Sequence, residues 1–419
     1  MDGKKILERV KTGSAGVLFA AVLFGTGCAS TIQVVDQSKV PEPRGYIGFV
    51  SRLDLKIEEA GSASHPGGVW YYEHDSFSEK KPEEYIMDLR TTYMGLELQN
   101  PVVASASPLS EKLDNFRRME DAGAAAVVMF SLFEEQIKHE NAAIEHLITS
   151  GAESYAESLS FFPEFEDYET GPDEYLNLLR RATEAVDIPV IGSLNGITNE
   201  GWVDTARLMQ DAGASGIELN AYYIPANLYM DGREVEQRYL EVLKAVKAAV
   251  SIPVAMKLSP FFSATGNMAR QFDEAGADAL VLFNRFYQPD LDLDEMQVVT
   301  DLKLSTPDEI RLPLLWIGVL HGRINASLAA TTGVHSPQEL IKYLLAGADV
   351  VMSTSGMLRH GIGFLTTLVE GLQDWMAARE YESVAQLRGS MSQVNCLNPG
   401  AFERANYIKI LENYKAEYE

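Results

Sequence analysis

Four short phrases of nearly the same composition decide the fold of this chain. They read Asp121-Ala-Gly-Ala124, Asp211-Ala-Gly-Ala214, Glu274-Ala-Gly-Ala277 and Ala346-Gly-Ala348. Each phrase follows a stretch with helical patterning and precedes a β-rich apolar run. A glycine ends a helix in the left-handed region, and its small neighbours let the next strand pack closely. The phrase therefore predicts a helix-to-strand connection that recurs along the chain.

Outward from these phrases, the sequence contains eight candidates for buried strands. They are continuous apolar runs rather than alternating ones, which is typical of strands that are covered on both faces. The candidates are Pro101–Ser105, Ala126–Met129, the run that opens Ile188-Pro-Val190, Gly216–Asn220, the run that opens Ile252-Pro-Val254, Ala279–Asn284, Leu328–Thr332 and Asp349–Thr354.

Helical patterns separate most of these strands, for example at Trp202–Asp211, Val235–Ala249 and Pro337–Leu345. Alternation of strand and helix eight times over predicts an α/β fold, a (β/α)₈ TIM barrel that spans 88–390. An open doubly wound sheet is the alternative, but no Gly-x-Gly-x-x-Gly motif follows the first strand. We expect 391–419 to form a helical tail after the barrel.

The first residues resemble a bacterial lipoprotein signal. Positive residues precede the short apolar run Ala15–Phe24, and small residues then lead to Cys28. The run is too short to span a bilayer as a permanent helix. The interpretation is that 1–28 is a signal segment and that Cys28 carries a lipid anchor; the alternative is an amphipathic helix without a targeting role. The following 29–87 is a small extension to which the sequence assigns no function.

Composition excludes several classes of partner and cofactor. The formal net charge of −25 argues against binding to nucleic acid or to an anionic membrane surface. The chain has two cysteines, Cys28 and Cys396, and no Cys-x-x-Cys pair, which argues against a zinc or iron–sulfur site. We therefore expect a small-molecule substrate and no metal.

Polar residues end three of the predicted strands, where a barrel enzyme forms its active site. They are Asn220, Lys257 and Asn284. As a cation, Lys257 could stabilise negative charge at the N1–C2=O edge of a reduced flavin. A Schiff-base lysine and a structural ion pair across the barrel are the alternatives. The small residues of Ala104-Ser-Ala-Ser107 would let a planar ring lie against the backbone.

Two turns with free backbone N–H groups follow the last two strands. They are Ala330-Thr-Thr-Gly-Val334, which leads to a helix at Ser336-Pro337, and Ser353-Thr-Ser-Gly356. Loops after strands 7 and 8 are the usual phosphate site of such barrels. A third loop, between the second and third strands, is too long for one crossover helix, and its aromatic and acidic segment Ser160–Thr170 fits either a substrate lid or a solvated excursion.

Taken together, these motifs resemble the dihydroorotate dehydrogenase family, and most closely its single-chain class 1 type. The segment that precedes the first strand, Met87–Pro101, is similar to the opening of that family. The remaining motifs follow in family order: Glu218-Leu-Asn220, Met256-Lys-Leu258, Phe283-Asn284, and Thr332-Gly-Val334 with Leu345-Ala-Gly-Ala348. The resemblance implies non-covalently bound FMN, a homodimer, and hydride transfer between the flavin and a CH–CH or C=C bond next to a carbonyl. Oxidation of dihydroorotate to orotate in pyrimidine biosynthesis, or a related reaction, is the implied activity.

The resemblance also implies roles for individual residues. Those that would contact the cofactor are Ser105, Ala106, Ser107, Lys257, Gly322, Thr332, Gly333, Thr354 and Ser355. Three asparagines, Asn220, Asn227 and Asn284, would hold the substrate.

The sequence departs from the family where proton transfer is expected. Where the family has a Cys or Ser as its base, this chain has Tyr223 or Ile224 at the corresponding position. Phe130 replaces a lysine at the end of the second strand. A phenol with an ordinary pKa of about 10 is a poor base. We take Tyr222 and Tyr223 as candidate proton donors in the reaction of another carbonyl substrate.

Two other functions stay open at this point. One is a phosphate-ligand barrel that works as an aldolase or lyase through Lys257. The other is a non-catalytic envelope lipoprotein on a barrel scaffold. The sequence also gives two conflicting expectations for the localisation. An FMN barrel is expected in the cytoplasm, whereas a functional signal at Met1–Cys28 would anchor the chain to a membrane.

Overall fold

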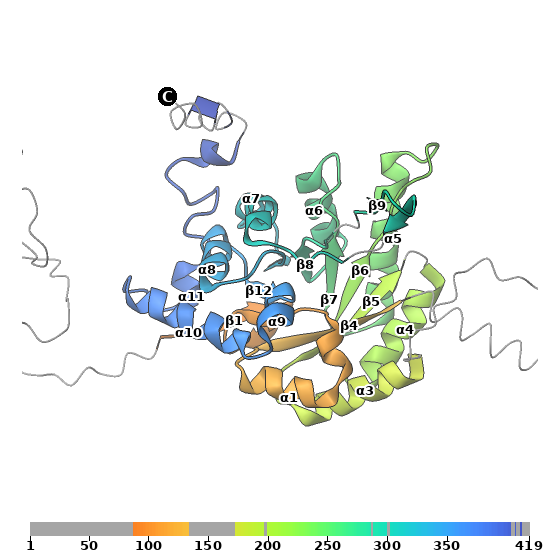
Figure 1. Cartoon of the computed structure of the whole chain (residues 1–419), viewed down its shortest axis with the longest axis horizontal. Helices are drawn as coiled ribbons and strands as arrows, with labels where there is room; N and C mark the ends of the chain where they lie inside the picture. The colour runs from red at the N-terminus through yellow and green to blue at the C-terminus, as the bar shows by residue number, and fades with distance from the viewer. Residues whose placement is uncertain are drawn as a thin grey trace, which may run out of the picture. The chain divides into compact units, whose positions relative to one another are not determined.

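A computed structural model describes residues 87–133, 172–196, 199–285, 288–299 and 302–403, with 407 and 411–412 (Figure 1). These residues belong to one compact unit, Lys80–Glu419. The predicted signal segment, nearly all of the extension 29–87, and the candidate lid Ser160–Thr170 lie outside the described residues. No helix within the described ranges is both long and apolar enough to cross a membrane.

Eight parallel strands form a closed barrel, as the sequence predicts. Around the barrel the strand order is β11-β12-β3-β4-β5-β6-β7-β8, so the first barrel strand pairs with the last. In chain order the barrel strands are β3 (Val102–Ala104), β4 (Ala126–Phe133), β5 (Val190–Gly196), β6 (Gly216–Ala221), β7 (Val254–Leu258), β8 (Ala279–Leu282), β11 (Ser327–Ala330) and β12 (Val350–Ser353). Each coincides with one of the predicted apolar runs.

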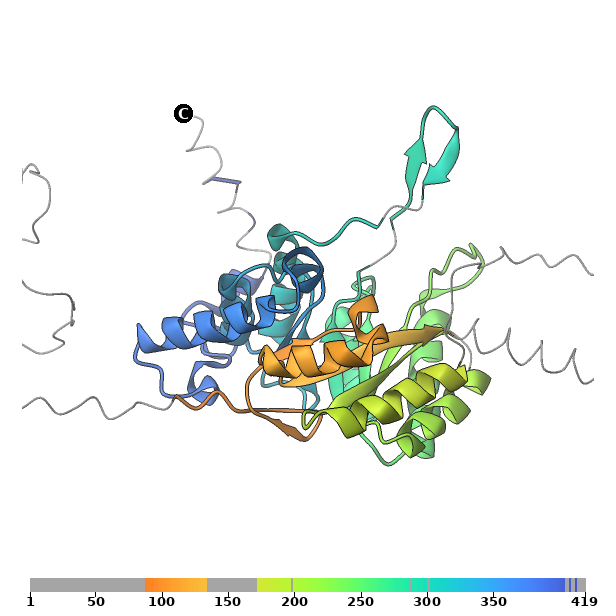
Figure 2. The ribbon, with the colours of Figure 1, turned by 60° about the horizontal axis from the view of Figure 1, so that its bottom comes forward.

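Helices lie around the outside of the barrel (Figure 2). They are α1 (Leu113–Asp121), α3 (Pro172–Ala185), α4 (Asn199–Asp211), α5 (Gly232–Ala249), α6 (Thr265–Glu274), α7 (Arg311–Leu320), α8 (Pro337–Ala346), α9 (Ser355–His360), α10 (Phe364–Ala377) and α11 (Val384–Leu387). Short 3-10 turns are η4 (Pro108–Glu111), η5 (Pro307–Ile310) and η6 (Pro399–Phe402). Outward-facing strand residues such as Ile217 and Leu219 join these helices in the larger apolar core.

The recurring Ala-Gly-Ala phrase makes the predicted connection. Its four glycines, Gly123, Gly213, Gly276 and Gly347, have φ angles of 92°, 94°, 93° and 121°. At Gly347 the backbone N–H bonds back to the carbonyls of Tyr343 and Leu344, which closes α8. At the other end of α8 the Ser336 hydroxyl accepts the N–H of Gln338, and Pro337 fills the first turn.

A hairpin that the sequence analysis did not predict closes the amino-terminal end of the barrel. It consists of β1 (Thr91–Tyr93) and β2 (Leu96–Leu98), which pair antiparallel. Tyr93 and Met94 are buried among inward-facing strand residues such as Val103 and Ile191. A Cβ at Gly216 would lie 2.9 Å from the terminal methyl of Met94, which explains the glycine there. The opposite, carboxyl end of the barrel is therefore the end where a site can form.

A second unpredicted hairpin follows β8. Its strands are β9 (Asp290–Asp292) and β10 (Gln297–Val299), with Leu291 directly opposite Val298. Both of these apolar side chains are exposed, as are Leu293 and Met296 near the turn. The hairpin therefore carries an uncovered apolar face.

Candidate active site at the carboxyl end of the barrel

Three polar side chains lie side by side across neighbouring strands. In the register of the barrel, Asn195 of β5 pairs with Asn220 of β6, and Asn220 pairs with Lys257 of β7. Asn284, just after β8, donates from Nδ2 to the Oδ1 of Asn220 over 2.8 Å. The structure thus brings together three of the predicted site residues, Asn220, Lys257 and Asn284.

Lys257 forms a buried ion pair with Glu218. Its Nζ lies 3.2 Å from Glu218 Oε1, and the side chains are 9% and 1% exposed. The ion pair that the sequence left open as an alternative is therefore present, between adjacent strands. The second carboxylate oxygen, Glu218 Oε2, is buried and has no hydrogen-bond partner within the described part of the chain.

Two buried phenols feel the charge of Glu218. The pKa of Tyr93, in the hairpin below, is raised mainly by burial and further by Glu218. The pKa of Tyr175 on α3 is also raised mainly by burial, and Glu218 adds to the effect. The Tyr175 hydroxyl accepts the backbone N–H of Ser193 over 2.9 Å, and Ser193 Oγ lies 2.8 Å from Ser131 Oγ. A small polar network thus lines the barrel beside the ion pair.

The predicted phosphate loops converge on a serine from another segment. The Gly333 N–H donates to Ser305 Oγ over 3.2 Å, and Ser305 Oγ donates to Ser355 Oγ over 3.0 Å. The backbone N–H of Ser305 also donates to Ser355 Oγ, over 3.2 Å. The Ser305 side chain is buried. Its hydroxyl oxygen contacts both loops, and its position is therefore one where these loops can bind an oxygen atom.

Thr332 and Gly333, in the loop after β11, both adopt a left-handed backbone conformation. Both have positive φ, 83° and 77°, which is unfavourable for a β-branched residue such as Thr332. The Thr332 hydroxyl donates to the carbonyl of Phe283, and the Tyr343 hydroxyl donates to the carbonyl of Thr332 over 2.8 Å. A Cβ at Gly333 would lie 2.6 Å from a methyl of Ile310, so η5 approaches this loop closely.

The loop after β3 lies against the loop after β12. The Ser105 N–H donates to the carbonyl of Ser353 over 3.1 Å, and Thr354 Oγ1 donates to the carbonyl of Ala106 over 3.2 Å. The Ser107 hydroxyl is buried without a partner among the described residues. Ser105 and Ala106 therefore adjoin Ser353 and Thr354.

Two predicted residues do not join this group. Gly322 follows α7 and precedes β11, so it lies at the amino-terminal end of the barrel, opposite the site. Its φ of 73° closes the turn after α7, which is a structural reason for the glycine. Asn227 lies on the exposed loop between β6 and α5, where its Oδ1 accepts the Tyr229 N–H over 3.0 Å. The sequence interpretation of Gly322 is therefore corrected, whereas the role of Asn227 stays a prediction.

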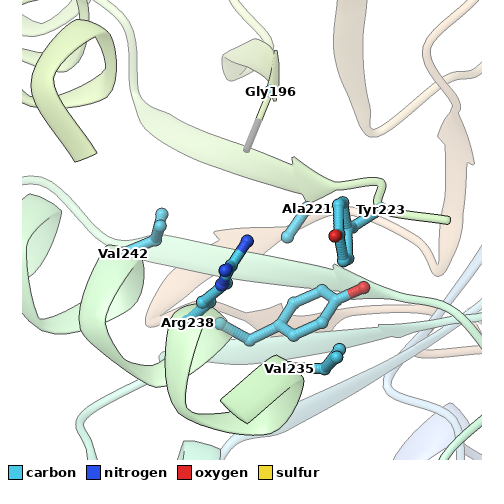
Figure 3. Close-up of a pocket in the computed structure, with 7 residues that line it drawn as sticks. Gly196, Ala221, Tyr223, Val235, Arg238 and Val242 are labelled. Atoms are coloured by element: carbon cyan, nitrogen blue, oxygen red, sulfur yellow. The ribbon is translucent and has the colours of Figure 1, made fainter. Parts of the chain in front are cut away.

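Tyr223 packs against α5. Figure 3 shows its ring grouped with Val235 and Arg238 of that helix, and the Arg238 guanidinium lies 5.6 Å from the ring centroid. The Tyr223 hydroxyl lies 3.5 Å from the sulfur of Met230. Nearby, burial raises the pKa of Tyr239 to about 12. Tyr222, the residue directly after β6, is half-buried.

The chain is similar in sequence to curated dihydroorotate dehydrogenases and to a subunit of a dihydropyrimidine dehydrogenase, whereas no family model matches it. The catalytic subunit of dihydroorotate dehydrogenase B (NAD(+)) from Methanocaldococcus jannaschii is 27% identical over 284 residues, which is 65% of this chain and 88% of that protein. Its counterpart from Thermoplasma acidophilum is 24% identical over 308 residues, 72% of this chain and 98% of that protein. A subunit of the NAD-dependent dihydropyrimidine dehydrogenase of Escherichia coli is 24% identical over 320 residues, 72% of this chain and 76% of that protein.

The chain is a divergent relative of the dihydroorotate dehydrogenases. This confirms the resemblance drawn from the motifs. In this dihydroorotate dehydrogenase-like chain, Phe130 replaces the expected lysine and packs edge-on against Tyr175, with ring centroids 5.0 Å apart. Among the described residues, no group of three or more His, Cys, Asp or Glu side chains could hold a metal ion.

Sequence reasoning gave no role to several residues of this site. Glu218 and Ser193 are polar residues at inward positions of otherwise apolar strands, and that interruption is the signal that could have identified them. Asn195 continues the same alternation on β5. Ser305 carries no such signal, because it lies in an irregular segment before η5 and reaches the loops only through the tertiary fold.

Proposed function

We propose that this protein is an FMN-dependent oxidoreductase. It transfers a hydride between the flavin and a CH–CH or C=C bond next to a carbonyl. The observation that carries the proposal is the buried Lys257 ammonium at the carboxyl end of β7, beside the bonded amides of Asn220 and Asn284. A buried cation next to directional polar groups suits a cofactor that gains negative charge on reduction.

The residues at the carboxyl end of the barrel fit FMN. Lys257 would meet the N1–C2=O edge of the ring, and the backbone of Ser105–Ser107 would lie along it. The loops with Thr332, Gly333, Thr354 and Ser355 would hold the phosphate. The position of Ser305 Oγ, which accepts the Gly333 N–H, is one that a phosphate oxygen can take when Ser305 moves away. When bound, FMN would supply the hydride acceptor or donor.

The Asn220–Asn284 pair supports a substrate with carbonyl, carboxylate or ring-amide groups. Asn284 already donates to Asn220, which leaves the Nδ2 of Asn220 as a donor for the substrate. Dihydroorotate and related dihydropyrimidines carry such groups beside the C–C bond that reacts. Oxidation of dihydroorotate to orotate in pyrimidine biosynthesis is therefore the first candidate reaction, and a related ring is the second.

Tyr222 is the better of the two candidate proton donors. The Tyr223 hydroxyl is directed to Met230, and its ring is held by Arg238 of α5. Tyr222 directly follows the strand that carries Asn220. A phenol can donate a proton at neutral pH but accepts one poorly, since its ordinary pKa is about 10.

The Schiff-base alternative is weakened by the ion pair. A Schiff base begins from a free amine that can attack a carbonyl, whereas the amine of Lys257 is held 3.2 Å from the carboxylate of Glu218. Borohydride in the presence of a carbonyl substrate would leave an adduct on Lys257 if that alternative holds. We expect no adduct by mass spectrometry.

The test is to incubate the purified protein with FMN, remove free flavin and record the visible spectrum. We expect a flavin spectrum that is bleached under anaerobic conditions by dihydroorotate or dihydrouracil. Lys257→Met should bind the flavin but lose most of the reduction rate. A protein that takes up no FMN would contradict the proposal, and a flavoprotein that neither substrate reduces would exclude the two candidate substrates.

A further inference from the structure

We propose that Glu218 sets the reduction potential of the flavin by offsetting the charge of Lys257. The inference rests on the proposed function, because it concerns the cofactor named there. Glu218 does not need to contact the substrate, so its role is electrostatic positioning rather than catalysis.

The geometry couples the carboxylate to the lysine and to little else. Glu218 Oε1 lies 3.2 Å from Lys257 Nζ, and neither side chain has appreciable access to water. Glu218 Oε2 has no hydrogen-bond donor within the described residues. An unpartnered buried carboxylate oxygen costs free energy. Apolar replacements of buried ion pairs are often neutral or stabilising. Stability alone therefore does not explain why a carboxylate is present at position 218.

The pair and the lone lysine act differently on the ring. A hydride carries two electrons and one proton from a substrate C–H bond to the oxidised flavin. If N1 stays unprotonated, this reduction would place one negative charge at the N1–C2=O edge, next to Lys257. An isolated ammonium would stabilise that charge as a monopole, whereas an ammonium beside a carboxylate acts as a dipole with a weaker field. Glu218 therefore lowers the potential relative to Lys257 alone.

The groups around Glu218 screen its charge only weakly. Its carboxylate contributes to the raised pKa of two phenols, Tyr93 on the hairpin below and Tyr175 on α3, although burial is the larger cause for both. Inward-facing neighbours such as Ala255 and Val281 are apolar, so the local dielectric screening is weak.

The experiment measures the midpoint potential of the FMN-loaded protein and of Glu218→Gln by spectroelectrochemistry. The isosteric amide removes the charge. We expect a shift to more positive potential that corresponds to at least a tenfold larger equilibrium constant for reduction, about 30 mV for a two-electron couple. An unchanged or more negative potential would overturn the inference.

A second pair of variants keeps the inference testable if Glu218→Gln does not fold. In Lys257→Met, measured at alkaline pH so that the unpaired carboxylate beside the ring stays ionised, the potential should fall below that of the wild type at the same pH. In the double variant Lys257→Met, Glu218→Gln the pair is replaced by neutral side chains of similar size, and the potential should rise again by at least tenfold in the same equilibrium constant. Equal potentials in these two variants would also overturn the inference.

A matched control uses a second lysine–carboxylate pair, which is only partly buried. Lys247 Nζ lies 2.5 Å from Asp278 Oδ2, and Asp278 precedes β8 at the amino-terminal end. Asp278→Asn should leave the potential unchanged, and a shift as large as that of Glu218→Gln would contradict a local effect. Failure of the wild type to bind FMN is a different result, because it overturns the proposed function and not the role of Glu218 in particular.

Discussion

His335 anchors the segment that carries Ser305, and its protonation state matters for that contact. Its Nε2 lies 2.6 Å from the Ser305 carbonyl, so Nε2 carries the hydrogen and Nδ1 is the acceptor. Nδ1 is buried without a partner among the described residues. Burial is the main cause that lowers the pKa of His335 from its ordinary 6.5, because it disfavours the charged imidazolium, and the positive charge of Arg359 adds to the effect.

The lowered pKa gives stability a defined pH dependence. A group whose folded pKa is below its unfolded pKa contributes stability above the unfolded value, and that contribution is lost as the pH falls through the folded value. We expect the wild type to lose stability faster than His335→Gln as the pH falls below about 6.5. Urea denaturation over a range of pH measures this, and parallel curves for the two proteins would contradict it.

Ser305 is bonded to both of the loops proposed to hold the phosphate. Because Gly333 N–H and Ser355 Oγ both contact Ser305, FMN would displace these contacts if it binds as proposed. A hydrogen bond contributes a net ~0.5–1.5 kcal/mol, so Ser305→Ala should bind FMN about 2- to 10-fold more tightly. Fluorescence titration measures the affinity, and riboflavin, which has no phosphate, is the control whose affinity should not change. Weaker FMN binding by Ser305→Ala would identify Ser305 as a phosphate ligand instead.

At the scale of elements, the β1–β2 hairpin, which closes the amino-terminal end of the barrel (its floor), contributes to stability. Tyr93 is fully buried there, beneath the Glu218 layer. Truncation of a large buried aromatic costs about 3–5 kcal/mol, and we expect this loss for Tyr93→Ala in chemical denaturation. The control is Tyr229→Ala, because Tyr229 is 97% exposed and a surface change is usually within about 0.5 kcal/mol. Similar losses for both variants would show that the hairpin is not a stabilising floor.

Sequence patterns predicted those elements whose structure is encoded by residues close together in the chain. The Ala-Gly-Ala connections and the continuous apolar runs are local, and they gave all eight barrel strands. The two hairpins were missed because strands such as Thr91–Tyr93 are too short to show alternation. Within the site, Asn220, Lys257 and Asn284 could be predicted because strand ends converge in a barrel. Ser305 and Gly322 could not be placed, since their positions depend on tertiary packing and on the end of the barrel at which a turn lies.

At the scale of the whole molecule, the homodimer implied by the family resemblance stays a prediction. A net charge of −25 makes two copies repel, so association needs apolar contact and should strengthen as salt screens the charge. The exposed Leu291 and Val298 of the β9–β10 hairpin are the candidate contact. We expect light scattering to report a dimer at moderate salt and a monomer for Leu291→Lys, Val298→Lys. A dimer that is unaffected by both changes would contradict this contact.

The predicted signal at 1–28 concerns the whole molecule as well. It lies outside the described residues and stays a prediction. A functional signal would give a mature chain that begins at a lipid-modified Cys28. Mass spectrometry of the N-terminus, with Cys28→Ser as control, checks this expectation, and an unmodified Met1 would contradict it.

The pairing of the first barrel strand with the last also constrains how the chain acquires its structure. β3 is hydrogen-bonded to β12, Asp88 bridges to Ser383, and the Thr91 hydroxyl donates to the carbonyl of Asp349 over 2.9 Å. These contacts have a high contact order, and a nascent chain on the ribosome cannot form them before β12 has been synthesised. Until then the sheet has two open edges that can pair with other chains. Chains truncated before Val350 should therefore aggregate rather than persist as smaller folded proteins.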